Sequence, residues 1–219
     1  MNRLTLLSVL CLLSFFFLSL YVAFTQFNNS YVTLNFDELL LVQINQIAIF
    51  LPSIMNNFML IITFYGREIF WPIVLILLVV LGGKEGKKTA LITGLSMLLL
   101  IPVISITKDL VERDRPDLEI TEFTIQTDTF SFPSGHAALV SAGVAGVSVM
   151  FRGTTKRTML SIFLASEAAL VCISRIYLGV HYPLDIVGGI LLGAGFSFFM
   201  IRLFNLLYPK MYFLNKKLG

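Results

Sequence analysis

Residues 174–185 read Ser-Arg-Ile-Tyr-Leu-Gly-Val-His-Tyr-Pro-Leu-Asp and separate two long apolar segments of the chain. Ionisable groups are costly at the edge of a hydrophobic segment and are retained there mainly for function. His181 and Asp185 stand four residues apart, so their side chains share a face if Pro183 begins the second helix. A carboxylate bonded to one ring nitrogen fixes the tautomer and leaves the other nitrogen free to act as a nucleophile. The alternative is a helix cap beside a surface arginine.

The composition is that of a protein with several membrane spans. Of the 219 residues, 57% are hydrophobic and 13% are charged, against about 25% charged residues in soluble domains. The apolar runs suit helices that need about 20 residues to cross a hydrocarbon core, and the weak alternation of membrane barrels is missing. Two cysteines and two histidines are too few for a disulfide framework or a metal site, and no aromatic-rich basic run indicates nucleic acid.

The apolar segments predict an all-α polytopic membrane protein with six transmembrane helices. They cover residues 4–24, 70–81 extended back to 67, 89–107, 134–151, 158–173 and 184–207. The first is interpreted as a retained span, because no small-residue cleavage site for a signal peptidase lies near its end. Residues 37–50 and 54–64 are too short or too polar to span, so they predict a pair of short interfacial helices between the first two spans. We expect one domain over residues 1–219, with its motifs in 108–185.

Basic residues gather at one end of the predicted spans. Eleven of the 16 Lys and Arg residues share a side with the N-terminus, and such an excess marks the cytoplasmic side. We therefore expect both termini in the cytoplasm of a multi-pass cell-membrane protein. The other five basic residues lie at the opposite end: Arg67, Lys108, Arg113, Arg115 and Arg175. Glu167 lies within a span, where a protonated or hydrogen-bonded residue is favoured over a proton relay.

Two further clusters lie at the same end as His181. Lys108 precedes Arg115 by seven residues, which on a continuous helix is about two turns and nearly the same face, so both would reach one anion. Pro133-Ser134-Gly135-His136 begins the fourth predicted span, where free amides and the helix dipole favour an anion. The alternatives are basic residues at the headgroup level and a helix cap with an interfacial histidine.

Together the three clusters supply what phosphoryl transfer requires. Three cations, a set of backbone amides and two imidazoles provide charge neutralisation, a nucleophile and a proton donor. Because cationic side chains do the work of charge neutralisation, we expect neither a metal nor another cofactor.

The spacing of eleven residues resembles the signature of the type 2 phosphatidic acid phosphatase superfamily. The matching positions are Lys108, Arg115, Pro116, Pro133, Ser134, Gly135, His136, Ser174, Arg175, His181 and Asp185. That superfamily includes lipid phosphate phosphatases, bacterial acid phosphatases, glucose-6-phosphatase and vanadium haloperoxidases. The motifs cover residues 108–185, and the six-span layout extends the resemblance to nearly the whole chain.

The resemblance implies a role for each polar motif residue. His181 would attack phosphorus and form a phosphohistidine, with Asp185 orienting it, and His136 would protonate the leaving oxygen and later activate water. The implied phosphate-binding residues are Lys108, Arg115, Ser134, Gly135 and Arg175. Because one imidazole must be neutral and the other protonated, we expect a bell-shaped dependence of activity on pH.

The position of the site predicts a lipid substrate. An opening at the headgroup level between apolar spans favours a phosphate on a lipid over a soluble ester. Compact relatives resemble undecaprenyl-diphosphate, phosphatidylglycerophosphate and phosphatidic acid phosphatases, and the small chain without an added extracellular domain favours polyprenyl diphosphate. A lipid phosphotransferase with the same phosphohistidine and a lipid or ion transporter remain alternatives. No obligatory protein partner is expected.

Overall fold

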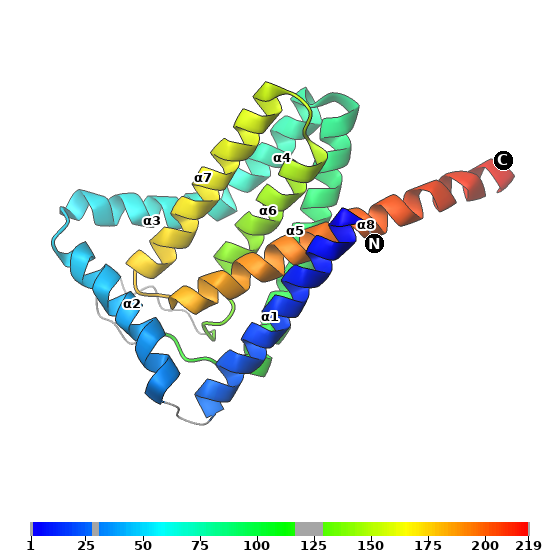
Figure 1. The fold of residues 1–219 in the computed structure, drawn as a ribbon. Coiled ribbons are helices and arrows are strands. Elements are labelled where there is room, and N and C mark those ends of the chain that lie inside the picture. Colours follow the sequence, from blue (N-terminus) through cyan, green and yellow to red (C-terminus); the bar gives the residue numbers. More distant parts are fainter. Residues whose placement is uncertain (1, 28–30, 117–128, 219) are drawn as a thin grey trace.

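The computed structural model describes residues 2–27, 31–116 and 129–218, and these ranges contain helices and loops without strands. Eight helices follow one another in the described part: α1 (Arg3–Phe27), α2 (Tyr31–Ile49), α3 (Ser53–Glu68), α4 (Phe70–Leu81), α5 (Gly83–Val111), α6 (Gly135–Met150), α7 (Thr155–Tyr177) and α8 (Pro183–Leu218). Figure 1 shows their arrangement. For these residues the all-α prediction is confirmed.

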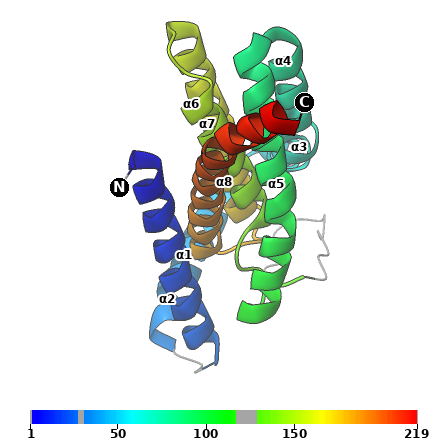
Figure 2. The same cartoon turned by 90° about the vertical axis from the view of Figure 1, so that its right-hand side faces the viewer.

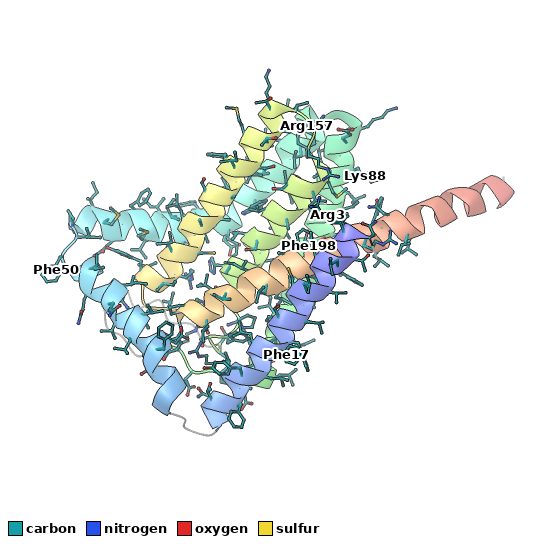
Figure 3. The ribbon with its side chains drawn as sticks, in the orientation of Figure 1. Arg3, Phe17, Phe50, Lys88, Arg157 and Phe198 are labelled. Atoms are coloured by element: carbon teal, nitrogen blue, oxygen red, sulfur yellow. The ribbon has the colours of Figure 1, made fainter. Side chains whose placement is uncertain are left out.

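Among the described residues, four helices are long and apolar enough to cross a membrane, namely α1, α5, α7 and the Pro183–Leu207 part of α8. The pair α3 and α4 passes the same test together, but the two helices meet at a bend of 44°. Large apolar side chains such as Phe17, 64% exposed and labelled in Figure 3, lie on the outer surface, as lipid contact requires. Because α6 has 16 residues, fewer than the about 20 that a span needs, the fourth predicted span, residues 134–151, stays a prediction, and so does the total of six.

The predicted interfacial pair corresponds to α2 and α3, and both helices are longer than expected. α2 has 19 residues and α3 has 16, and α3 continues into α4 with only Ile69 between them. α3 packs against α7 as well as α4, and α2 contacts α7 and α8. These two helices therefore form part of the helical packing around the site, and their position at a membrane interface stays a prediction.

The centre of the structure is the contact between α6 and α8. A Cβ added at Gly193 would lie 2.0 Å from the backbone oxygen of Ala138, and one added at Gly189 would lie 2.6 Å from the backbone oxygen of Ser134. Only glycine permits this approach, so the backbones of α6 and α8 lie in close contact at these positions. α8 lies between α1 and α6 (Figures 1 and 2), while α5 and α7 also pack against α6.

The order of the helices brings the three motifs to one end of the bundle. The α4–α5 and α6–α7 connections lie at the opposite end, where Figure 3 labels Lys88 and Arg157. The last turn of α5, the first turn of α6 and the α7–α8 loop are therefore neighbours. This end holds most of the polar groups considered below.

Two helix ends differ from the prediction in ways that change the site. α5 ends at Val111, and Glu112 adopts the left-handed conformation with φ 49°. The prediction that Lys108 and Arg115 share a helix face is therefore wrong, because the helix stops between them. α7 continues to Tyr177, so Arg175 lies on the helix. The sequence from Lys108 to Ser131 is polar and has no helix-length apolar run, and within it residues 117–128 lie outside the described residues.

Candidate active site

The predicted pairing of His181 with Asp185 is present. Pro183 begins α8, and His181 Nδ1 lies 3.2 Å from Asp185 Oδ2, with the two side chains 2% and 0% exposed. Burial lowers the pKa of His181 to about 3, although the hydrogen bond and charge of Asp185 oppose the shift. The imidazole is therefore neutral at physiological pH. A neutral imidazole donates through one nitrogen only, so Nδ1–H donates to the carboxylate and Nε2 keeps its lone pair.

The second nitrogen of His181 faces a cation. Nε2 lies 3.3 Å from Arg115 Nη1, and a guanidinium can only donate, so Nε2 is the acceptor of this contact. Both neighbours of the ring thus select the same tautomer. The Nε2 lone pair, which would attack phosphorus, therefore points at the Arg115 guanidinium, which would bind a phosphoryl oxygen.

Lys108 and Arg115 converge through the backbone of residues 129–131. Arg115 donates to the carbonyls of Thr129 and Val180, each at 2.8 Å, and more distantly to that of Phe130 at 3.4 Å. Lys108 also donates to the Phe130 carbonyl. Both cations donate to the Phe130 carbonyl, so carbonyl oxygens and not a shared helix face bring them together. That they bind one anion stays a prediction.

Arg175 is the most deeply placed of the predicted phosphate-binding residues. Its side chain lies on α7 with 4% of the residue exposed, and Nη1 donates to Thr63 Oγ1 of α3 at 2.8 Å. Its Nε has no hydrogen-bond partner in the described part of the chain. The guanidinium is close enough to Lys108 and His136 to interact with both electrostatically. A buried arginine with an unused N–H is suited to receive an anion.

Ser134 and Gly135 form the start of α6, as predicted. Ser134 Oγ accepts from the amide of Ala137 at 3.4 Å, which caps the helix and leaves the hydroxyl hydrogen for another acceptor. The Ser134 amide donates to the Asp185 carbonyl at 3.0 Å, which ties this loop to α8. A Cβ added at Gly135 would lie 3.7 Å from Ile104, so the surrounding protein tolerates a side chain there. Gly135 lines a cavity with Lys108, however, and a side chain would enter that cavity.

His136 contacts a residue to which the sequence analysis gave no role. Arg67, in the last turn of α3, places Nη1 3.4 Å from His136 Nδ1. Because the guanidinium donates, Nδ1 accepts and the proton of the neutral ring lies on Nε2. His136 and His181 are close enough to interact electrostatically, as the predicted acid and nucleophile must be.

A buried ion network behind Asp185 was also missed. Arg113 donates from Nη1 to Asp185 Oδ1 and from Nη2 to Asp37 Oδ2, each at 2.7 Å. Asp37 Oδ1 accepts from the amide of Leu184 at 3.0 Å, and the Tyr182 ring lies 4.0 Å from the guanidinium. Burial lowers the pKa of Arg113, but the two carboxylates outweigh burial and hold that pKa above its ordinary value. The network fixes the carboxylate that orients His181.

Two cavities meet the site from different sides. One, of about 530 Å³, runs between α4, α5 and α6 and includes Lys108 and Gly135 among mostly apolar side chains. The other, of about 520 Å³, lies against α3 and includes His136 and Arg175. Arg67 lines both. The polar cluster is thus reachable along apolar walls.

Comparison with known proteins identifies the family of this chain. Residues 89–208, more than half of the chain, match the PAP2 superfamily. The undecaprenyl-diphosphatase of Sulfolobus acidocaldarius is 31% identical over 88% of this chain and 88% of its own length. Phosphatidylglycerophosphatase B of Bacillus subtilis is 35% identical over 69% of this chain and 75% of its own. The crystal structure of the transmembrane PAP2 type phosphatidylglycerolphosphate phosphatase from Bacillus subtilis has a TM-score of 0.64 at 25% identity, covering 90% of this chain and 94% of that one. This chain therefore belongs to the PAP2 superfamily and is a membrane enzyme of the phosphatase class.

Proposed function

We propose that the protein hydrolyses the phosphate monoester or diphosphate of a membrane lipid through a phosphohistidine at His181, and that polyprenyl diphosphate is its best substrate. One observation carries the proposal: His181 Nδ1 is bonded to a buried carboxylate while Nε2 faces Arg115. A neutral imidazole oriented from behind and aimed at a cation has the arrangement of an activated nucleophile.

In the first step the Nε2 lone pair of His181 attacks phosphorus. The bond from phosphorus to the leaving oxygen breaks, its electron pair goes to that oxygen, and His136 Nε2 supplies the proton. Lys108, Arg115 and Arg175 neutralise the equatorial oxygens, and the Gly135 amide and Ser134 hydroxyl add donors. The negative charge of Asp185 stabilises the positive charge that develops on His181.

In the second step water replaces the histidine. His136, now neutral, takes a proton from water, whose oxygen attacks the phosphohistidine. The phosphorus–nitrogen bond breaks, its electron pair returns to His181 Nε2, and inorganic phosphate is released. Both steps use the same cations, because the phosphoryl group stays in place while its two axial partners change.

The walls of the cavities and the names of the relatives support a lipid substrate. The larger cavity extends from Lys108 past Ile104 and Met97 to Leu75, which would give an acyl or prenyl tail an apolar path within the bilayer. The relatives at 31% and 35% identity are named for undecaprenyl diphosphate and phosphatidylglycerophosphate. The first covers more of both chains, and we therefore favour the polyprenyl substrate.

We place the site at the extracytoplasmic face, because eleven of the 16 basic residues fall on the opposite side of the predicted spans. A cysteine introduced at the exposed Lys84, near the α4–α5 connection, would then be protected from a membrane-impermeant thiol reagent in intact cells. Labelling of that cysteine in intact cells would reverse the orientation.

Purified protein offered a panel of prenyl and glycerolipid phosphates, with free phosphate measured, tests the activity. We expect His181→Ala to lower the rate by at least about 10²-fold, as loss of a nucleophile or acid–base group does. Brief reaction with a substrate labelled at its terminal phosphate should leave acid-labile label on the wild-type protein and none on His181→Ala. Near wild-type turnover by His181→Ala contradicts the covalent mechanism, and label passed to a second lipid favours a phosphotransferase.

A further inference from the structure

We infer that Arg67 forms a subsite for the second phosphate of a lipid diphosphate, the phosphate that departs with the lipid. This inference rests on the proposed function, since it assigns a place to the leaving group of that reaction. It makes Arg67 a determinant of the preference for diphosphates over monophosphates.

The first observation is where Arg67 lies. It is in the last turn of α3, directly before the bend into α4, and it lines both cavities that reach the site. Its side chain is 27% exposed, whereas the side chain of Arg113 is 4% exposed. Among the described residues, Arg113 pairs with two buried carboxylates, whereas Arg67 pairs with the carboxylate of the half-exposed Glu68. Arg67 can therefore change partners at a lower cost than Arg113.

The second observation is what Arg67 touches. Its Nη1 lies 3.4 Å from His136 Nδ1. In an in-line transfer the nucleophile and the leaving oxygen lie on opposite sides of phosphorus. If His181 attacks and His136 protonates the leaving oxygen, the leaving group lies beside His136. A cation in contact with His136 is thus next to the leaving group and not next to the phosphoryl group being transferred.

The chemistry of the leaving group then separates two substrate classes. A phosphate monoester releases an alcohol, which needs a proton and carries no charge. A diphosphate releases a lipid monophosphate, whose oxygens are negatively charged and match the planar fork of a guanidinium. Arg67 would therefore contribute binding energy for a diphosphate that a monophosphate cannot use.

The contact with His136 gives Arg67 a second consequence. A protonated imidazole has an N–H at both nitrogens and cannot accept from a guanidinium. The observed Arg67–His136 contact thus belongs to the neutral ring, and Arg67 must turn away when His136 carries the proton for the leaving oxygen. A second phosphate offers Arg67 an acceptor at that moment. Diphosphate binding would thereby release His136 Nδ1 as well as hold the leaving group.

The test compares one prenyl chain carrying either a monophosphate or a diphosphate. Purified wild type, Arg67→Gln and Arg67→Lys are assayed in the same detergent for kcat/KM on both substrates, by release of free phosphate. Arg157→Gln is the matched control, because Arg157 has a side chain 28% exposed and paired with one glutamate, Glu85, at the other end of the bundle. We expect Arg67→Gln to lower kcat/KM for the diphosphate about 10- to 100-fold and for the monophosphate less than about threefold. For the diphosphate, the kcat/KM of Arg67→Lys should lie between those of wild type and Arg67→Gln. Arg157→Gln should have the kcat/KM of wild type on both substrates.

The outcomes separate this inference from the function beneath it. Equal losses on both substrates, with a displaced alkaline limb of the pH profile, would mean that Arg67 only positions His136, and the subsite would be wrong while the phosphatase remained. A wild type that cleaves monophosphates and ignores diphosphates would also overturn the subsite. Release of phosphate from neither substrate by wild type would overturn the proposed function itself. If Arg67→Gln melts well below wild type, the charge-conserving Arg67→Lys decides the comparison.

Discussion

Asp37→Asn tests whether a helix outside the motifs controls the nucleophile. Asp37 belongs to α2, and its carboxylate accepts from Arg113 Nη2 at 2.7 Å and from the Leu184 amide at 3.0 Å. An asparagine has one carbonyl oxygen, so it can satisfy one of these donors and must turn its own N–H groups toward the other. The chain of Asp37, Arg113, Asp185 and His181 would lose its outer negative charge.

The size of the effect follows from the burial of the pair. The side chains of Arg113 and Asp37 are 4% and 2% exposed, and removing one partner of a buried ion pair costs about 3–5 kcal/mol. Because asparagine keeps one contact, we expect the lower end, about 3 kcal/mol of stability. For turnover, Arg113 would then neutralise Asp185 more fully, and Asp185 would stabilise the positive phosphohistidine less. We expect kcat to fall about tenfold, equal to about 1.4 kcal/mol, with KM little changed because Asp37 lines neither cavity.

The assay has a matched control on the same helix turn. Glu38 is exposed and adjacent to Asp37, so Glu38→Gln removes the same charge while keeping the buried carboxylate of Asp37 and its contacts with Arg113 and Leu184. Turnover and thermal melting are measured for both variants and for wild type across pH. Burial raises the pKa of Asp37, with Arg113 opposing the shift, so acidification should mimic the substitution in wild type. Below that pKa the carboxyl is protonated, and the fall of wild-type kcat toward acid pH should be smaller in Asp37→Asn.

Three results would refute this reasoning. If Asp37→Asn and Glu38→Gln have the same kcat at neutral pH, the network does not act on His181. If Asp37→Asn is less stable but turns over like wild type with an unchanged pH profile, Asp37 only attaches α2 to the bundle. A raised KM with normal kcat would likewise place its effect on substrate binding.

Two further predictions concern pH and packing. His181 in the unfolded chain takes up a proton near pH 6.5 but in the folded protein only near 3, so acidification from pH 7 to 5 favours unfolding by about 2 kcal/mol, or about 4–8 °C in Tm. His181→Gln should remove that share of the pH dependence, and an unchanged slope would show that His181 is not buried and neutral. Gly193→Ala places a Cβ 2.0 Å from the Ala138 oxygen and should cost about 1–3 kcal/mol or more, whereas Gly94→Ala meets only Leu75 at 3.5 Å and should not destabilise. Equal Tm values for the two alanine variants would contradict the close α6–α8 contact.

The motif residues could be predicted because their chemistry depends on the type of each side chain and on short spacings in the sequence. Four residues from His181 to Asp185 across Pro183 define a helix start, and the geometry follows from the helix repeat. The meeting of His136 with this pair was inferred from sidedness, since antiparallel spans return each motif to the same end. The first arrangement follows from the helix repeat, and the second follows from the alternating direction of successive spans.

The arrangement of Lys108 and Arg115 could not be predicted in the same way. The helical face was extrapolated through Glu112, whose left-handed backbone ends α5, and glutamate is not a residue type that signals such an end. The two cations still meet, because the carbonyls of residues 129–131 lie opposite both. Backbone acceptors carry no signature in a sequence, so this part of the site depends on the folded loop.

Asp37 and Arg67 show a second limit. Each is visible as an ionisable residue near a short, mixed apolar segment, and Arg67 was one of five basic residues at the site end. Their partners are 76 and 69 residues away, at Arg113 and His136. Nothing local to either residue specifies such a pairing, because it depends on how α2 and α3 fold back over the bundle.

This division suggests how the two parts of the chain share the chemistry. In the proposed mechanism the motif residues between 108 and 185 provide the nucleophile, the acid and the phosphate-binding groups, and all of them lie on α5 to α8 and their loops. α2 and α3 provide groups that contact motif residues directly, as Thr63 contacts Arg175 and Arg67 contacts His136, or through Arg113, as Asp37 does for Asp185. A change in α2 or α3 would therefore alter turnover or substrate preference while leaving the phosphate-binding groups intact. α3 also lines a cavity that reaches His136. We therefore expect discrimination between lipid phosphates to depend on residues of α3 more than on the motif residues.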